Sequence, residues 1–221
     1  MLERLPSGCK SLDLLLGGGF ESGIITELYG ESGTGKSNIV LQLAVQAVSR
    51  GQRVIFIDTE GFSAERFRQI AGPSAEDMAK KIMIFEPMSL EQQAIAVRES
   101  SKIAGRDLGL IILDSATSLY RVLLEAEDNR PFRRALNAQL AELQENARRH
   151  RIPVVITNQV YIDIEKNELR PIGGTGLEHM CKVILFLEKK GEGLRSARIM
   201  KHRCAPEGAM ADFRLTAQGV E

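Results

Sequence analysis

The sequence predicts an α/β fold, in which a mainly parallel, twisted sheet is flanked by helices and extended by antiparallel strands toward the C-terminal end. The first observation is a set of short apolar segments without polar alternation, which is typical of strands buried on both faces. They cover residues 24–29, 53–58, 82–85, 110–114 and 153–158. The second observation is that helical segments separate them through residue 158. Such alternation indicates βαβ units and therefore parallel strands.

The helical segments carry start and stop signals. They cover residues 38–50, 89–104 and about 131–150. The first is closed by Gly51, a residue common just after a helix. The second begins with Ser89 and Gln92 at the spacing of a capping box. Both signals support helices at these places.

Beyond residue 158 the pattern changes. Further apolar segments are separated by turns that contain glycine rather than by helices, which predicts antiparallel pairing. They cover residues 183–188, 195–202 and 212–216. No repeat or linker divides the 221 residues, and a chain of this length can bury a large core. We therefore expect residues 1–221 to form a single core domain.

Composition excludes several classes of protein. With 43% hydrophobic and 26% charged residues the chain is neither disordered nor fibrous, and 29 basic against 29 acidic residues give no overall field that would name a partner. Three cysteines without a C-x-x-C pair argue against a disulfide framework or a zinc module. No apolar run approaches the roughly 20 residues of a membrane span. We expect a soluble protein of the cytoplasm.

A glycine-rich motif follows the first predicted strand. It fits the pattern G-x-x-x-x-G-K-[ST] between a strand and a helix. The backbone N–H groups of such a loop and the helix after it bind phosphates, the lysine reaches the β- and γ-phosphates, and the final hydroxyl can bind Mg²⁺. The predicted nucleotide-binding residues are Gly30, Glu31, Ser32, Gly33, Thr34, Gly35, Lys36 and Ser37.

Polar residues end three predicted strands at what should be one edge of the sheet. Asp114 ends an apolar run and is the predicted Mg²⁺ partner together with Ser37, although alone it could be a turn or cap residue. Either Asp58 or Glu60 could activate the attacking water while the other caps the next helix. Gln159 could sense the γ-phosphate or simply cap its strand.

These segments together resemble the core of the RecA-like recombinase family. They are residues 30–37, 58–61, 113–121 and 156–160. The resemblance spans essentially the whole chain, and the short length with residues 201–208 resembles the short archaeal paralogues of the recombinase RadA. It implies a RecA-like P-loop NTPase core, ATP and Mg²⁺ as cofactors, weak hydrolysis, and a part in homologous recombination and DNA repair. The implied partners are single-stranded or branched DNA, RadA, and a Holliday-junction resolvase under regulation by this protein.

The same resemblance assigns roles to single residues. Glu60 takes the place of the catalytic glutamate, Gln159 that of the switch residue, and Arg66 that of an arginine that stacks on adenine. With Lys36, the first two form the expected catalytic set. Full recombinases have a separate N-terminal DNA-binding domain and a polymerisation segment before this core. Their second DNA-binding loop, which corresponds to residues 160–172 here, is longer than in this chain. The resemblance therefore implies a homo-oligomer that forms filaments poorly and lacks strand exchange.

Two groups of basic residues are candidate contacts for DNA phosphates. The first group is Arg130, Arg133 and Arg134, and the second is the seven basic residues Lys182, Lys189, Lys190, Arg195, Arg198, Lys201 and Arg203. A solvated helix start explains the first group equally well, and a protected sheet edge explains the second. Because little aromatic sequence accompanies these residues, we expect contacts with the DNA backbone rather than with bases.

Lys201 and Arg203 alternate along what the sequence suggests is an edge strand, so their side chains should share one side. Full recombinases place an aspartate and a proline here to cap the ATP of a neighbouring subunit, and a clock protein of the KaiC type places a lysine and an arginine. The resemblance therefore implies contact with the γ-phosphate of a neighbour. DNA phosphate or a solvated edge are the alternatives.

Two other functions remain open on the sequence. The first is a KaiC-like oligomeric ATPase or autokinase, although that family would have paired glutamates where this chain has Glu60 followed by Gly61. The second is an ATP-gated binding module with negligible turnover. Hydrolysis measured with and without DNA would separate them.

Overall fold

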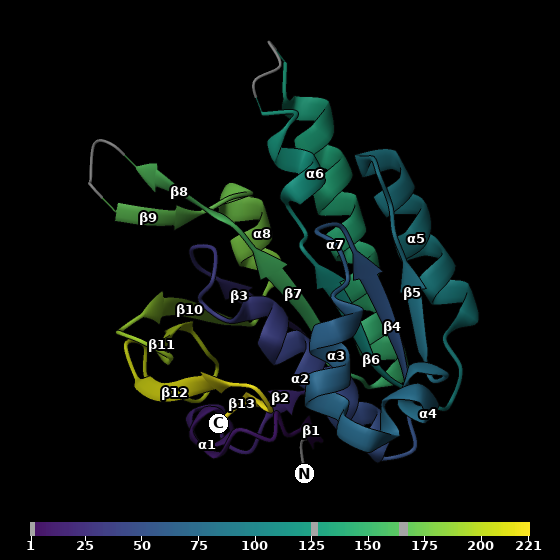
Figure 1. The fold of residues 1–221 in the computed structure, drawn as a ribbon. Coiled ribbons are helices and arrows are strands. Elements are labelled where there is room, and N and C mark those ends of the chain that lie inside the picture. Colours follow the sequence, from purple (N-terminus) through teal and green to yellow (C-terminus); the bar gives the residue numbers. More distant parts are fainter. Residues whose placement is uncertain (1–2, 125–127, 164–167) are drawn as a thin grey trace.

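The computed structural model describes residues 3–124, 128–163 and 168–221 (Figure 1). Its helices and strands, in chain order, are β1 (Arg4–Leu5), α1 (Lys10–Leu15), β2 (Phe20–Glu21), β3 (Ile25–Tyr29), α2 (Lys36–Ser49), β4 (Arg53–Asp58), α3 (Ala64–Ala71), the 3-10 turn Gly72–Ser74, α4 (Ala75–Ala79), β5 (Ile82–Phe85), α5 (Leu90–Ile103), β6 (Leu108–Asp114), α6 (Ser118–Arg121), α7 (Arg130–His150), β7 (Val154–Asn158), β8 (Val160–Asp163), β9 (Glu168–Pro171), α8 (Gly174–Met180), β10 (Val183–Lys189), β11 (Leu194–Lys201), β12 (Met210–Thr216) and β13 (Gly219–Val220).

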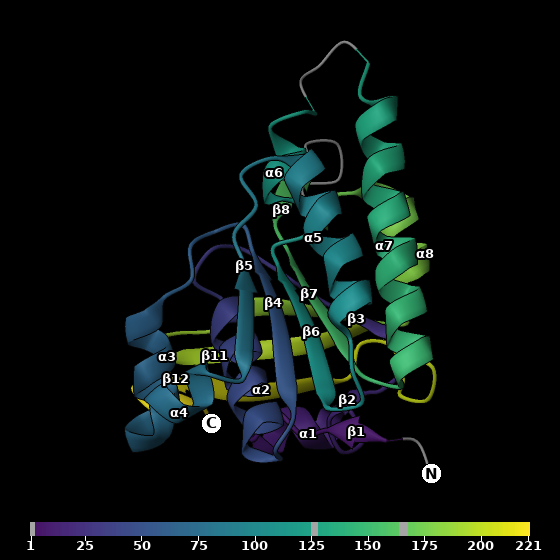
Figure 2. The same ribbon diagram turned by 90° about the vertical axis from the view of Figure 1, so that its right-hand side faces the viewer.

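A nine-stranded sheet runs through the molecule in the order β13-β12-β11-β10-β3-β7-β6-β4-β5. The strands from β10 to β5 pair in parallel, and β11, β12 and β13 add antiparallel strands at the other side. Figure 2 shows that the twist of the sheet carries β11 and β12 crosswise to β4 and β6. The predicted fold class is confirmed, with the addition that β10 belongs to both parts of the sheet.

Helices cover both faces of the parallel strands because neighbouring residues of a strand point to opposite faces. In β4, Val54 and Phe56 pack in the core under α2, α3 and α4, while Ile55 and Ile57 pack in the core under α5, α7 and α8. All residues of β3, β6 and β7 are buried. The apolar runs without alternation are therefore central strands, as predicted.

The strand β5 departs from that expectation. It is the last strand of the sheet, and only Ile82 is buried, while Met83 and Ile84 are 43% and 39% exposed. Its apolar composition suggests burial on both faces. An edge position explains the difference, because one side of such a strand has no neighbour to cover it.

The long helices lie where the sequence places them. Ser89 caps α5 by accepting the N–H of Gln92 at 3.2 Å. The helix α7 is polar along one side and apolar along the other. Among the described residues, no helix combines the length and apolar character that a membrane crossing requires.

Parallel strands bring their carboxyl ends to one edge of the sheet. There Asp58 at the end of β4 pairs with Asp114 at the end of β6, and Tyr29 at the end of β3 pairs with Asn158 at the end of β7. The helix α6 and the hairpin of β8 and β9 lie beyond the same edge, at the top of Figure 1. Polar residues that follow these strands therefore meet in one place.

Candidate nucleotide-binding site

The loop between β3 and α2 has a backbone that requires glycine. Gly33 and Gly35 have φ of 76° and 101°, values at which a Cβ is strained. At Gly30 a Cβ would lie 2.3 Å from the carbonyl oxygen of Leu187 in β10. Gly35 caps α2, so the loop leads directly into the positive end of a 14-residue helix. This is a preformed cradle for an anion.

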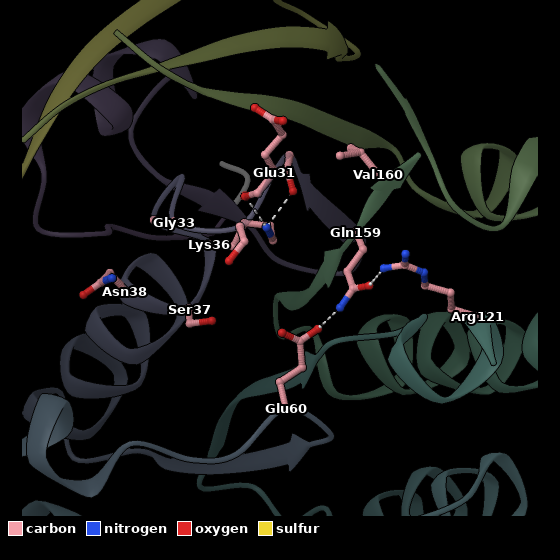
Figure 3. A pocket seen from close by; sticks show the side chains of 12 residues that line it. Glu31, Gly33, Lys36, Ser37, Asn38, Glu60, Arg121, Gln159 and Val160 are labelled. Atoms are coloured by element: carbon pink, nitrogen blue, oxygen red, sulfur yellow. Dashed lines mark hydrogen bonds between the residues drawn. The ribbon is translucent and has the colours of Figure 1, made fainter. Parts of the chain in front are cut away.

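Lys36 spans this cradle. Its Nζ donates hydrogen bonds to the carbonyl oxygens of Gly30, at 2.6 Å, and Glu31, at 2.9 Å (Figure 3). Burial lowers the pKa of Lys36, while the charges of Glu60 and Asp114 act in the opposite direction. The side chain borders a cavity of about 270 Å³. A phosphate that replaced the two carbonyl oxygens would pair with a cation that is already in place.

Asp114 is buried beside Lys36 and Ser37, the first two residues of α2. Its carboxylate accepts hydrogen bonds from the hydroxyls of Thr157 and Ser37. Burial raises the pKa of Asp114 to about 6, and both hydroxyls work against that rise. Neighbouring hydroxyl and carboxylate oxygens suit Mg²⁺, which takes few protein ligands and shares the substrate phosphates. The donor set therefore fits the expected metal.

No cluster of three or more His, Cys, Asp or Glu side chains within the described ranges could enclose a metal ion by itself. A Mg²⁺ ion at the candidate site would be held by Ser37, Asp114 and nucleotide phosphates. When bound, it would neutralise charge on those phosphates.

The structure gives different surroundings to Asp58, the last residue of β4, and Glu60, which follows the strand. Asp58 is buried, and its carboxylate accepts the backbone N–H groups of Glu60 at 3.4 Å and Gly61 at 3.0 Å. Burial raises the pKa of Asp58, and these hydrogen bonds lower it. Asp58 thus shapes the turn, whereas Glu60 is exposed and lines the cavity. The arrangement favours Glu60 as the base.

Gln159 links Glu60 to Arg121, a residue that no sequence motif singled out. Its Nε2 donates to Glu60 Oε1 at 2.7 Å, and its Oε1 accepts from the Arg121 guanidinium at 3.1 Å (Figure 3). Arg121 is the last residue of α6 and also lines the cavity. Its place at the end of the segment 113–121 was the only signal for it. The three side chains connect the phosphate cavity with α6 and with β8, which starts directly after Gln159.

A buried polar network lies behind Gln159. Asn158 donates through Nδ2 to Glu27 Oε1 and to the carbonyl oxygen of Ile172, each at 2.7 Å, and accepts from Thr117 at 2.6 Å. Glu27 is 0% exposed, and its Oε2 has no hydrogen-bond partner among the described residues. Burial raises the pKa of Glu27 to about 7, opposed mainly by the hydrogen bond from Asn158. The carboxyl is therefore costly to ionise.

We expect this residue to make stability fall as the pH rises. An exposed glutamate titrates at 4.5, so between that value and about 7 the folded chain holds a proton that the unfolded chain releases. The contribution of Glu27 to the free energy of unfolding is fully present below pH 4.5. About 3 kcal/mol of that contribution is lost once the pH rises above about 7. Denaturant unfolding of Glu27→Gln from about pH 5 to pH 8 should lack this fall.

The matched control is Glu178→Gln, since Glu178 is exposed and lies close enough to influence Glu27. That variant should keep most of the pH dependence. A wild-type slope that survives in Glu27→Gln would show that another group is responsible. The cost of a buried amide would shift the whole curve without changing its slope.

Arg66, the residue expected to stack on adenine, lies beside the start of α2 and uses its guanidinium donors in hydrogen bonds within the chain. The guanidinium donates to Asn38 Oδ1 and to the carbonyl oxygens of Thr216, at 2.7 Å, and Ala217, at 3.0 Å. It borders a second cavity of about 210 Å³ that also reaches Ser37. The turn after β12 therefore meets the phosphate-loop helix through this arginine.

The basic candidates for DNA contact lie in several places. Arg133 and Arg134 are exposed near the start of α7, where Arg130 forms a double hydrogen bond with Asp128 at 2.8 and 3.0 Å. Three lysines of the second group contact different elements rather than sharing one: Lys182 donates to His179 of α8, Lys190 pairs with Glu188, and Lys189 lies against Gly33.

The expectation that Lys201 and Arg203 share an edge strand is wrong. The strand β11 is paired on both sides, by β10 and β12, and it ends at Lys201. Lys201 donates to the carbonyl oxygen of Glu178 at 2.7 Å, whereas Arg203 pairs with Glu21 of β2 at 3.6 Å. A turn after the strand separates the two cations, and a pattern of two residues could not reveal it.

Comparison with known proteins places the chain in a family. The Rad51 family model matches residues 2–221. "DNA repair and recombination protein RadB" of Methanococcoides burtonii is 55% identical over 219 residues, covering 99% of this chain and 97% of that protein. The protein of the same name from Methanoculleus marisnigri is 42% identical over 221 residues, with coverage of 99% and 97%.

Comparison with a solved structure supports the same family relationship. The "Crystal structure of the RadB recombinase" matches with a TM-score of 0.86 and 36% identity, and the match covers 99% of both chains. The resemblance to the short archaeal recombinase paralogues is confirmed by these relatives. By family model, sequence and fold alike, the chain belongs to the Rad51 family of RecA-like recombinases.

Proposed function

We propose that the protein binds ATP with Mg²⁺, hydrolyses it slowly, and binds DNA as an accessory protein of homologous recombination and DNA repair. The observation that supports this most is the hydrogen-bonded chain Glu60, Gln159 and Arg121. It joins the phosphate cavity to α6 and β8, which lie toward the upper end of the molecule in Figure 1. A change at that end would thus reach the residue best placed to activate water.

The chemistry proposed for the site uses the chain's own groups. Lys36 would pair with the β- and γ-phosphates, and Ser37 and Asp114 would hold Mg²⁺. Glu60 would accept a proton from the water that attacks the γ-phosphorus, as the bond to the β–γ bridging oxygen breaks to give ADP and phosphate. Gln159 would hold Glu60 until nucleotide or DNA rearranges it. Slow turnover follows if that bond persists for much of the time.

We place DNA at the upper end of the molecule. Arg133 and Arg134 are exposed there at the start of α7, and the hairpin of β8 and β9 exposes Tyr161 and Ile162, by 52% and 64%. Residues 164–167, which follow β8 in the sequence, lie outside the described residues. Guanidinium groups bind phosphates irrespective of base, which supports contact without sequence preference.

Partners and assembly are proposed on the family resemblance. We expect RadA and a Holliday-junction resolvase as protein partners, a homo-oligomer that forms filaments poorly, and no strand exchange by the protein alone. Lys201 and Arg203 would act on the γ-phosphate of a neighbouring subunit or on DNA. The nine-stranded sheet, which includes strands from both halves of the chain, supports a single core domain.

Charge reversal at the two ends of α7 tests the DNA surface. Arg133→Glu/Arg134→Glu should weaken binding to single-stranded DNA and make it less dependent on salt, because each phosphate contact contributes roughly 0.7 to the slope of log K against log salt. Arg148→Glu/Arg149→Glu changes the net charge equally at the other end of the same helix and should have little effect. Fluorescence anisotropy over a salt series, with oligonucleotides of different sequence, measures both.

Equal reductions in affinity in the two double variants would mean that net charge rather than this surface governs binding. A strong preference for one base sequence, or an affinity independent of salt, would contradict backbone contact. ATP affinity measured alongside should stay at the wild-type level in both variants, because neither pair of residues borders the phosphate cavity.

A further inference from the structure

The hairpin of β10 and β11 touches the phosphate loop at its outer side. Arg195 Nε donates to the carbonyl oxygen of Gly33 at 2.9 Å. Lys189, its direct partner across the hairpin, approaches the same glycine, since Cε and Nζ lie 3.2 Å from where a Cβ on Gly33 would be. On the sequence alone, Lys189 and Arg195 both belong to a basic group that could contact DNA phosphates.

The Arg195 guanidinium is itself held in place. Its Nη1 donates to the carbonyl oxygens of Gly191, at 3.2 Å, and Leu194, at 2.9 Å, both in the hairpin. The guanidinium is a rigid, planar group with several donors, so three carbonyl oxygens fix its plane. It therefore acts as a fixed support rather than as a mobile surface charge.

The bond to Gly33 orients the part of the loop that must face phosphate. A trans peptide is planar, so a carbonyl that points outward turns the following N–H to the opposite side. That N–H belongs to Thr34, and its present hydrogen bond to the carbonyl oxygen of Glu31 is long, at 3.4 Å. A phosphate oxygen could replace so weak a partner. Because Gly33 has no side chain and a φ of 76°, external support matters at this residue.

The same antiparallel strands reach the other end of the site. The carbonyl oxygen of Thr216, the last residue of β12, accepts a hydrogen bond from the Arg66 guanidinium. The side chain of Leu215 lies 3.0 Å from where a Cβ on Gly35 would be. The positive charge of Lys189 also influences Lys36, since it is among the causes that lower the pKa of Lys36. The C-terminal strands thus border the candidate site at two points.

We propose that Arg195 is a positioning residue of the nucleotide site, which holds the Gly33 peptide so that the phosphate loop is preorganised for ATP. The inference rests on the proposed binding of ATP. It makes β11 part of the site, although β11 lies outside the phosphate-binding motif. Arg195 touches neither water nor phosphorus in this role, so its effect is on affinity rather than on the chemical step.

Titration with a fluorescent ATP analogue tests the proposal. Arg195→Ala should bind about tenfold more weakly, the reduction expected for one hydrogen bond from a charged donor. Arg198→Ala is the matched control, because Arg198 lies on the same strand and pairs with Glu188 at 3.5 Å, away from the loop. It should change affinity by less than about twofold. Arg195→Lys, which keeps the charge and one donor, should recover part of the affinity.

Two further readouts separate positioning from general structure and from charge. In hydrolysis assays KM should rise while kcat stays near the wild-type value, and the melting temperature without nucleotide should match that of Arg198→Ala. Lys189→Ala removes a neighbouring cation but keeps the bond to Gly33, so its affinity should fall less than that of Arg195→Ala.

The proposal is overturned if Arg195→Ala binds the analogue as well as Arg198→Ala does. It is also overturned if Lys189→Ala binds the analogue as weakly as Arg195→Ala while Arg195→Lys binds it as tightly as the wild type. Positive charge near the loop, rather than the hydrogen bond to Gly33, would then account for the affinity. If Arg195→Ala does not fold, Arg195→Lys decides by the same comparison. Failure of the wild-type protein to bind would reject the proposed function as well, whereas wild-type binding with no effect at Arg195 rejects this inference alone.

Discussion

Replacement of Lys36 by alanine should abolish tight ATP binding. Lys36 is 9% exposed, and its ammonium is hydrogen-bonded to two carbonyl oxygens of the phosphate loop. Removing one partner of a buried charge pair costs about 2 to 5 kcal/mol, which corresponds to roughly 30- to 5,000-fold in affinity. Isothermal titration with ATP and Mg²⁺ measures the loss directly.

Lys182→Ala is a suitable control for that experiment. Lys182 also donates to a backbone carbonyl oxygen, that of His179 at 3.2 Å, but it does not line the cavity. Its affinity for ATP should equal that of the wild type. An unchanged affinity in Lys36→Ala, with a similar melting temperature, would show that ATP does not bind at the phosphate loop.

The second large effect is expected for Glu60→Gln. Glutamine keeps the size of the side chain and can still bond to Gln159, but it cannot accept the proton of an attacking water. General base catalysis contributes about 100- to 10,000-fold, so hydrolysis should fall by that factor. ATP affinity should be retained, because in the structure Glu60 bonds to Gln159 and not to the loop. Phosphate release and a parallel binding titration measure the two properties.

Glu31→Gln is the control for the base, since Glu31 also lines the cavity and its contact with Lys36 is through the backbone. Its hydrolysis rate should remain close to that of the wild type. Normal turnover in Glu60→Gln would refute the assignment, and an equal reduction in Glu31→Gln would attribute the effect to the charge of the cavity.

Sequence patterns predict those elements of this protein whose signals lie within one continuous segment. The central strands have continuous apolar runs, the long helices have caps and length, and the phosphate loop is a continuous motif, so each is visible in one segment. The helices α1, α3, α4, α6 and α8 have at most eight residues. Helices of little more than two turns or fewer carry too little periodicity to be recognised.

Contacts between distant segments are not visible in a single sequence. Arg195 and Gly33 are separated by 162 positions, and Arg121 and Gln159 by 38. Nothing in the composition of these segments encodes either pairing. The first arises because the sheet places β10 beside β3, and the second because it places β6, which α6 follows, beside β7. The sequence likewise does not distinguish Asp58 from Glu60, whereas the turn after β4 shows that Asp58 is the buried carboxylate.

Single-turnover hydrolysis of radiolabelled ATP by excess wild-type protein, with and without single-stranded DNA, decides whether this protein is a slow ATPase that responds to DNA. We expect slow formation of ADP well above the rate in Glu60→Gln, and a changed rate when DNA is present, because Gln159 connects Glu60 to the end of the molecule where we propose that DNA binds. ATP that stays bound without conversion, at the same level with and without DNA, would contradict this function and leave an ATP-gated binding module.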